Sequence, residues 1–172
     1  MPRPRTIPDA AIFAALRQLL LTGGEKAVAF STVAQATGLA APTLVQRFGS
    51  RDEMVRAALN DGWDRLDAAL DLAALDSILG SKGIPALLKA VGSALDGAEA
   101  ALLGVSLRDA ALQQRAQAWR ARVEAELALR LGGGAKAAET AAMLFALWQG
   151  QAVWHGAGGK GYRLKDAVKR LI

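Results

Sequence analysis

Apolar residues along the chain recur at the three- and four-residue spacing of α-helices. Between residues 51 and 75, Val55, Leu59, Trp63, Leu66 and Leu70 follow one another at intervals of four, four, three and four. This spacing predicts one long amphipathic helix with a buried apolar face. Runs of Val, Ile, Thr and Tyr that are typical of strands are absent from the sequence.

Glycine and proline divide the remaining apolar stripes into further helices. Gly24 and Gly38 are expected helix ends, and Pro8 and Pro42 fit first turns. The expected helices are one capped by Thr6 and ended by Gly23-Gly24, then 30–37, 42–48, 51–75, 86–95, 99–107, 109–131, 135–155 and 164–172. We therefore expect an all-α fold of about nine helices.

The 109–131 helix has a single apolar stripe. Its members are Leu112, Ala116, Trp119, Val123 and Leu127. On the opposite side, Arg120 with Glu124 and Arg122 with Glu126 are expected to form ion pairs one turn apart.

The 135–155 helix is apolar nearly all round, and one chain of this size can hardly cover all its faces. We expect it to join the 164–172 helix and their twofold mates in a four-helix bundle, so that the protein is a homodimer. The expected interface residues are Leu144, Leu147, Trp148, Gln151, Leu164, Val168 and Leu171.

Charge is unevenly distributed along the chain. The net charge is +5, and residues 1–59 carry 7 Lys and Arg against 4 Asp and Glu. The remaining 113 residues carry 14 against 12. A mildly basic N-terminal part suits a polyanionic partner such as DNA.

Several functional classes lack the residues that they need. There is no cysteine for a disulfide or a thiolate metal site, and His155 is the only histidine. No Gly-rich phosphate loop follows a strand, so we expect no enzyme, no metal and no cofactor. Residues 140–159 are uncharged but interrupted by Gln149, Gln151 and glycines, which favours a buried helix over a membrane span. Without an export signal, the protein is expected to be cytoplasmic.

Residues 31–48 have the spacing of a helix-turn-helix. Ala34 is small where two helices would cross, Gly38 tolerates a positive φ in the turn, and Val33, Leu39 and Leu44 face inward. The outward positions are then Thr43, Gln46 and Arg47, which can donate to base edges or phosphates. An ordinary helical hairpin with a glycine turn is the alternative interpretation.

The motif continues into the next helix as Gly38-Leu-Ala-Ala-Pro-Thr-Leu-Val-Gln-Arg-Phe-Gly-Ser-Arg-Asp-Glu-Met54. This stretch resembles the recognition-helix signature of TetR (tetracycline-repressor) type transcription regulators. The resemblance is specific from about residue 12 to residue 59 and architectural beyond. It implies a DNA-binding head, residues 1–50, and a body, residues 51–172, that binds an effector and dimerises.

The resemblance also implies roles for single residues. Thr32 and Arg51 would contact DNA phosphates, and Thr43, Gln46 and Arg47 would enter the major groove. Val45 replaces the usual aromatic phosphate ligand and Arg51 the usual lysine. Since valine cannot hydrogen-bond, anchoring is expected to shift to Gln46, Arg47 and Arg51. Arg3 and Arg5 lie on a Pro-rich arm that either enters a minor groove or is a solvated tail.

For function, the resemblance implies a ligand-responsive repressor of a double-stranded DNA operator with inverted repeats. The effector is expected to be small and largely apolar, because the apolar faces around the expected pocket carry no charged residue. The expected pocket residues are Trp63, Leu66, Trp119, Leu147 and Trp148, although these faces can also simply pack together.

Two other functions stay open at this point. One is a helical adaptor or small-molecule-binding protein with a degenerate head, which Val45 makes conceivable. The other is a small helical enzyme with a hydrophobic pocket, which the shortage of His, Cys and clustered carboxylates disfavours.

Overall fold

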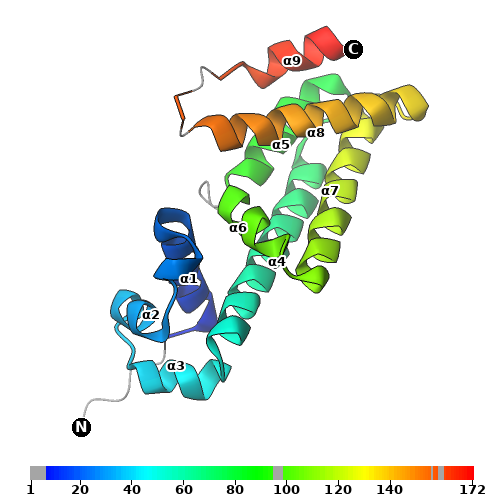
Figure 1. The fold of residues 1–172 in the computed structure, drawn as a ribbon. Helices are drawn as coiled ribbons and strands as arrows, with labels where there is room; N and C mark the ends of the chain where they lie inside the picture. The colour runs from blue at the N-terminus through cyan, green and yellow to red at the C-terminus, as the bar shows by residue number, and fades with distance from the viewer. Residues whose placement is uncertain (1–6, 95–98, 156, 159–160) are drawn as a thin grey trace. The chain divides into compact units, whose positions relative to one another are not determined.

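The computed structural model describes residues 7–94, 99–155, 157–158 and 161–172. Over these residues the fold is all-α with nine helices and no strand, which confirms the predicted class (Figure 1). The helices are α1 Asp9–Gly23, α2 Phe30–Thr37, α3 Ala41–Phe48, α4 Arg51–Asp76, α5 Ile84–Gly92, α6 Glu99–Ser106, α7 Ala110–Arg130, α8 Ala135–His155 and α9 Leu164–Leu171. Two 3-10 turns, η1 Glu25–Ala27 and η2 Ser81–Gly83, join them.

Most predicted helix ends are confirmed, and two starts were wrong. The N-cap of α1 is Pro8, whose backbone is extended, so the helix begins after Pro8 and is not capped by Thr6. Thr6 itself lies outside the described residues. Helix α5 begins at Ile84 rather than residue 86, because Pro85 fits its first turn. It ends at Gly92 rather than residue 95, so its predicted end was also wrong. At the start of α4, the backbone N–H of Glu53 donates to Ser50 Oγ at 3.1 Å, as the capping sequence predicted.

The helices pack as two compact units. Unit 1 comprises Met1–Asp64 and Ala101–Gln113, and unit 2 comprises Arg65–Ala100 and Gln114–Ile172. Helix α4 contributes to both. These packing units are not the same as the functional division at residue 50, which stays a prediction.

Unit 1 is built around a core from α1 to α4. Its fully covered side chains include Ile12, Leu16, Val33, Leu44, Met54 and Leu59. Arg17 of α1 is also buried, and its guanidinium donates to Asp61 Oδ2 at 2.5 Å and to the Ala58 carbonyl at 3.2 Å. Helix α1 is therefore tied to α4 by both apolar packing and a buried ion pair.

The predicted α7 stripe is buried as expected, but one predicted ion pair was wrong. Arg120 binds Glu124 at 2.7 Å, as predicted. Arg122 instead binds Asp67 and Asp71 of α4, and Glu126 binds Arg130 at 2.5 Å. The reason is that α4 presents two carboxylates to α7, and sequence spacing within α7 carries no information about them.

Helices α8 and α9 run side by side in opposite directions within unit 2 (Figure 1). Among the described residues, no helix combines the length and the apolar character needed to cross a membrane.

Candidate nucleic-acid interface

Helices α2 and α3 form the predicted helix-turn-helix. Gly38 has φ 74° and ψ 14°, a left-handed conformation that glycine adopts without strain, and its N–H donates to the Ala34 carbonyl at 2.8 Å. Val33 and Leu44 are completely buried between the helices. The turn therefore fixes α3 on α2 through the residues that the sequence indicated.

One face of α3 is left uncovered. Leu44 points into the core, and the ring of Phe48 packs against Phe13 of α1 with centroids 5.8 Å apart. Exposed residues on the other side are Pro42, Thr43, Val45, Gln46 and Arg47. The three predicted groove residues thus share one surface, together with Pro42 and Val45, which sequence reasoning did not include among them. The helical period of α3 was the signal that could have found them.

Arg47 lies on this surface but is held by α1. Its Nε contacts Asp9 Oδ1 at 2.5 Å, and its guanidinium donates to the Ile7 carbonyl at 2.8 Å. The guanidinium also lies 6.0 Å from the centroid of the Phe48 ring. Arg47 therefore joins the start of α1 to the end of α3.

Arg51 is engaged in a similar way. Its Nε donates to the carbonyl of Val28 and a terminal nitrogen to the carbonyl of Glu25, each at 2.7 Å. The other terminal nitrogen binds Asp52 Oδ1 at 3.0 Å. The start of α4 is thereby clamped to η1 and to the segment that leads into α2.

Thr32 uses its hydroxyl to cap α2. Its Oγ1 accepts a hydrogen bond from the Ala29 N–H at 2.9 Å and donates to the Ala27 carbonyl at 2.7 Å. Its single proton is thus committed to the backbone. Arg5, the remaining predicted DNA contact, lies outside the described residues.

A second set of contacts ties the segment between α6 and α7 to the rest of unit 1. The Trp63 indole N–H donates to Ser106 Oγ at 3.1 Å, and Arg108 binds Glu25 at 3.0 Å. Asp109 caps α7 and also accepts from Arg56 at 3.2 Å. The hydrogen bond from the Leu112 N–H, with Arg56 assisting, lowers the pKa of Asp109. Sequence reasoning missed the three side-chain pairs Trp63–Ser106, Arg56–Asp109 and Arg108–Glu25, because their partners are 43 to 83 residues apart.

The predicted dimer residues fall into two groups. Leu144, Trp148 and Val168 are buried within the single chain, although Trp148 still reaches the edge of a groove. Leu147 is exposed, and Gln151, Leu164 and Leu171 are half-buried.

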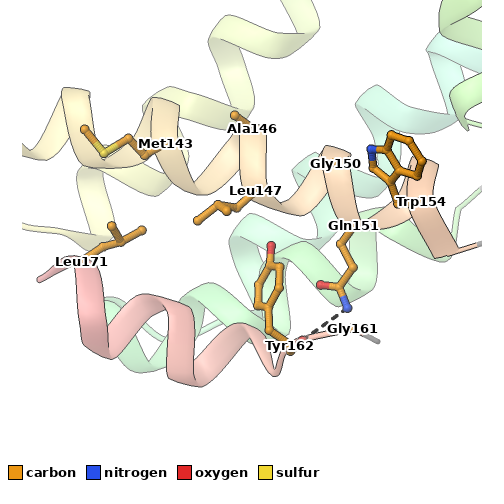
Figure 2. Close-up of a pocket in the computed structure, with 9 residues that line it drawn as sticks. All are labelled: Met143, Ala146, Leu147, Gly150, Gln151, Trp154, Gly161, Tyr162 and Leu171. Carbon is orange, nitrogen blue, oxygen red and sulfur yellow. Dashed lines mark hydrogen bonds between the residues drawn. The ribbon is translucent and has the colours of Figure 1, made fainter. Parts of the chain in front are cut away.

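A groove of about 650 Å³ lies between α8 and the segment that contains α9. It is lined by Met143, Ala146, Leu147, Gly150, Gln151, Trp154, Gly161, Tyr162 and Leu171 (Figure 2). Leu147, Leu171 and the Tyr162 ring point into the space between the helices (Figure 2). The Tyr162 hydroxyl is buried without a hydrogen-bond partner among the described residues, and burial raises the pKa of Tyr162. Apart from Gln151, this hydroxyl and the indole N–H of Trp154, the lining side chains are apolar.

The predicted effector residues are mostly covered. Trp63 and Leu66 are buried on α4. In unit 2, the rings of Trp119, Phe145 and Trp148 pack together with centroids 5.9 to 6.2 Å apart. Trp148 also lines a second groove of about 500 Å³ that includes Lys89 and Lys165.

Comparison with known proteins finds the same fold in transcription regulators. A TetR-like transcriptional regulator from Rhodococcus sp. RHA1 has a TM-score of 0.76 at 18% identity over 99% of this chain and 96% of that chain. A TetR transcriptional regulator from Legionella pneumophila has 0.75 at 17% identity over 98% and 97%. PfmR, a TetR family regulator from Thermus thermophilus, has 0.69 at 18% identity over 92% and 93%.

No protein-family profile matches the sequence. No curated protein matches it either. At these identities the structural likeness shows a shared fold, which is that of TetR-family regulators.

Proposed function

We propose that the protein is a DNA-binding transcription regulator that acts as a homodimeric, ligand-responsive repressor. The observation that carries the proposal is the uncovered face of α3, which a helix-turn-helix presents while its opposite face is fixed in the core. The fold shared with TetR-family regulators supports the same function.

Selection of bound duplexes from a random-sequence pool by the full-length protein tests the proposal. We expect enrichment of an inverted repeat, since a twofold dimer presents two related copies of α3 to one side of the duplex. Equal affinity for selected and random duplexes at moderate salt would refute the DNA-binding function.

Dimerisation is proposed to use the groove between α8 and α9. The residues that line it on α8 include the exposed Met143, Leu147 and Trp154, and an apolar surface of this kind is costly to leave in water. A second copy seated there would form a four-helix bundle and offer a hydrogen-bond partner to the Tyr162 hydroxyl. The interface is thus proposed to use these residues in place of the buried Leu144, Trp148 and Val168.

The effector is proposed to be a small, largely apolar molecule bound by the body. Titration with hydrophobic compounds, following tryptophan emission and operator release together in wild type and Trp119→Phe, tests this. Since Lys89 and Lys165 lie beside Trp148, carboxylates of the same size should be included in the series. The proposal fails if every compound that releases DNA is strongly charged, or if no compound that binds the protein alters DNA affinity.

A further inference from the structure

The outer face of α3 has a defined centre. Successive residues in an α-helix are rotated by roughly 100°, so a residue lies nearly opposite those two positions away. Gln46 is two positions from both Leu44 and Phe48, the residues that face the core. Gln46 therefore points straight outward, with Val45 on one flank and Arg47 on the other.

On one flank, the Arg47 side chain is bound by other residues of the same chain. Only 31% of its side chain is exposed, and its guanidinium contacts Asp9 and the Ile7 carbonyl. To bind a guanine through two nitrogens, Arg47 would have to give up at least one of these partners. The arginine that looks most suited to base recognition is thus engaged in holding α1 against α3.

The other flank is apolar. Val45 is 44% exposed, and Pro42, three residues earlier on the same side of α3, is exposed as well. Neither side chain can hydrogen-bond to a base or a phosphate. In the major groove, the feature that an apolar side chain recognises is the C5-methyl group of thymine.

The centre carries a free amide. Among the described residues, no hydrogen bond engages the side chain of Gln46, which is exposed. A glutamine amide in the major groove pairs with adenine through N6 and N7. Both the centre and the open flank therefore suit A·T base pairs.

Resting on the proposed function, we propose that the protein reads A·T pairs at the centre of each half-site. Gln46 hydrogen-bonds to an adenine, and Val45 with Pro42 contacts the methyl group of a neighbouring thymine. Arg47 is a positioning residue that fixes α3 on α1 and reads no base.

Atom-level substitutions in the selected duplex test the two readout contacts. Thymine is replaced by uracil, which lacks the methyl group, and adenine by 7-deazaadenine, which lacks N7, one position at a time. We expect wild-type affinity to fall about fourfold at one thymine per half-site, the contribution of one buried methyl group. At one adenine it should fall about fivefold or more.

The variants assign each effect to its side chain. Val45→Ala should reduce the thymine effect, because Pro42 and the shortened side chain keep part of the contact, and Gln46→Ala should remove the adenine effect. Matched controls are Leu21→Ala, 41% exposed on α1, and Gln18→Ala, exposed on the same helix, and both should keep both effects. An undiminished thymine effect in Val45→Ala, or an undiminished adenine effect in Gln46→Ala, overturns the assignment.

Arg47 is tested through base preference. Arg47→Ala and Asp9→Asn should lower the melting temperature and leave the preferred sequence unchanged, while Arg47→Lys should restore part of the loss. Half-sites centred on G·C pairs, with a guanine preference that Arg47→Ala relaxes, overturn this inference but leave the proposed function standing. If selection enriches no sequence, the proposed function itself fails.

Discussion

Replacing Arg51 by alanine should destabilise unit 1 rather than remove a phosphate contact. The side chain donates two hydrogen bonds of 2.7 Å to the carbonyls of Val28 and Glu25, and Val28 is buried. Hydrogen bonds from a charged donor contribute about 1.5 to 3 kcal/mol each to the free energy of unfolding. Because 40% of the side chain is exposed and water can replace part of the interaction, we expect Arg51→Ala to cost about 2 kcal/mol in total.

Urea denaturation followed by circular dichroism measures this effect at a fixed protein concentration, since the proposed dimerisation would make the stability depend on concentration. Arg56→Ala is the matched control on the same helix. Arg56 is 55% exposed and contacts Asp109 at 3.2 Å, so its loss should cost about 0 to 1 kcal/mol. Arg51→Lys should lie between wild type and Arg51→Ala, because one ammonium group replaces a fork that reaches two carbonyls.

The salt dependence of operator binding separates the two interpretations of Arg51. A positioning role predicts weaker binding at all salt concentrations with an unchanged slope. A phosphate ligand predicts that the slope of log affinity against log salt flattens by about 0.9 on substitution. An unchanged urea midpoint together with a flatter slope would refute the reasoning from the two carbonyls.

Three further substitutions test other parts of the structure. Leu147→Glu should give monomers in sedimentation, whereas the control Leu129→Glu, at an exposed leucine of α7, should stay dimeric. If both variants sediment as dimers, the α8 groove is not the interface. Gly38→Ala should lower the unfolding free energy by about 1 to 2 kcal/mol, because the left-handed conformation strains any side chain, and an unchanged urea midpoint would contradict this. Arg130→Met should lower the free energy of unfolding by about 3 kcal/mol in the same assay, since the side chain is fully buried and bound to Glu126. An unchanged urea midpoint would mean that this ion pair does not stabilise the fold.

The fold could be predicted because its signals are local. The helix-turn-helix needs a small residue, a glycine and apolar side chains at short, fixed spacings, and Ala34, Gly38 and Leu44 occupy the expected places in the structure. Helix ends followed glycine and proline for the same reason. The starts of α1 and α5 were wrong because a proline set each boundary, and α5 ends at Gly92, three residues earlier than predicted.

The surface of α8 could not be predicted in the same way. In a helix that is apolar nearly all round, periodicity does not distinguish a residue facing its own chain from one facing a partner. Leu144 and Trp148 face their own chain, while Met143 and Trp154 are exposed. The position of the neighbouring helices decides which residues of α8 are buried and which are exposed. The sequence of α8 alone does not specify that position.

The arginines of unit 1 show why the candidate site was harder to predict than the fold. Arg17, Arg47 and Arg51 each donate to a backbone carbonyl that lies between 23 and 41 residues away. No local spacing reveals such partners, so the sequence suggested contacts to DNA for two of these three residues. Since an arginine that satisfies carbonyls inside the protein has fewer donors left for phosphates, the net charge of residues 1–59 overstates the cations available to a duplex. Under the proposed function, specific recognition by this surface is therefore expected to depend more on the shape and hydrogen bonding of α3 than on charge.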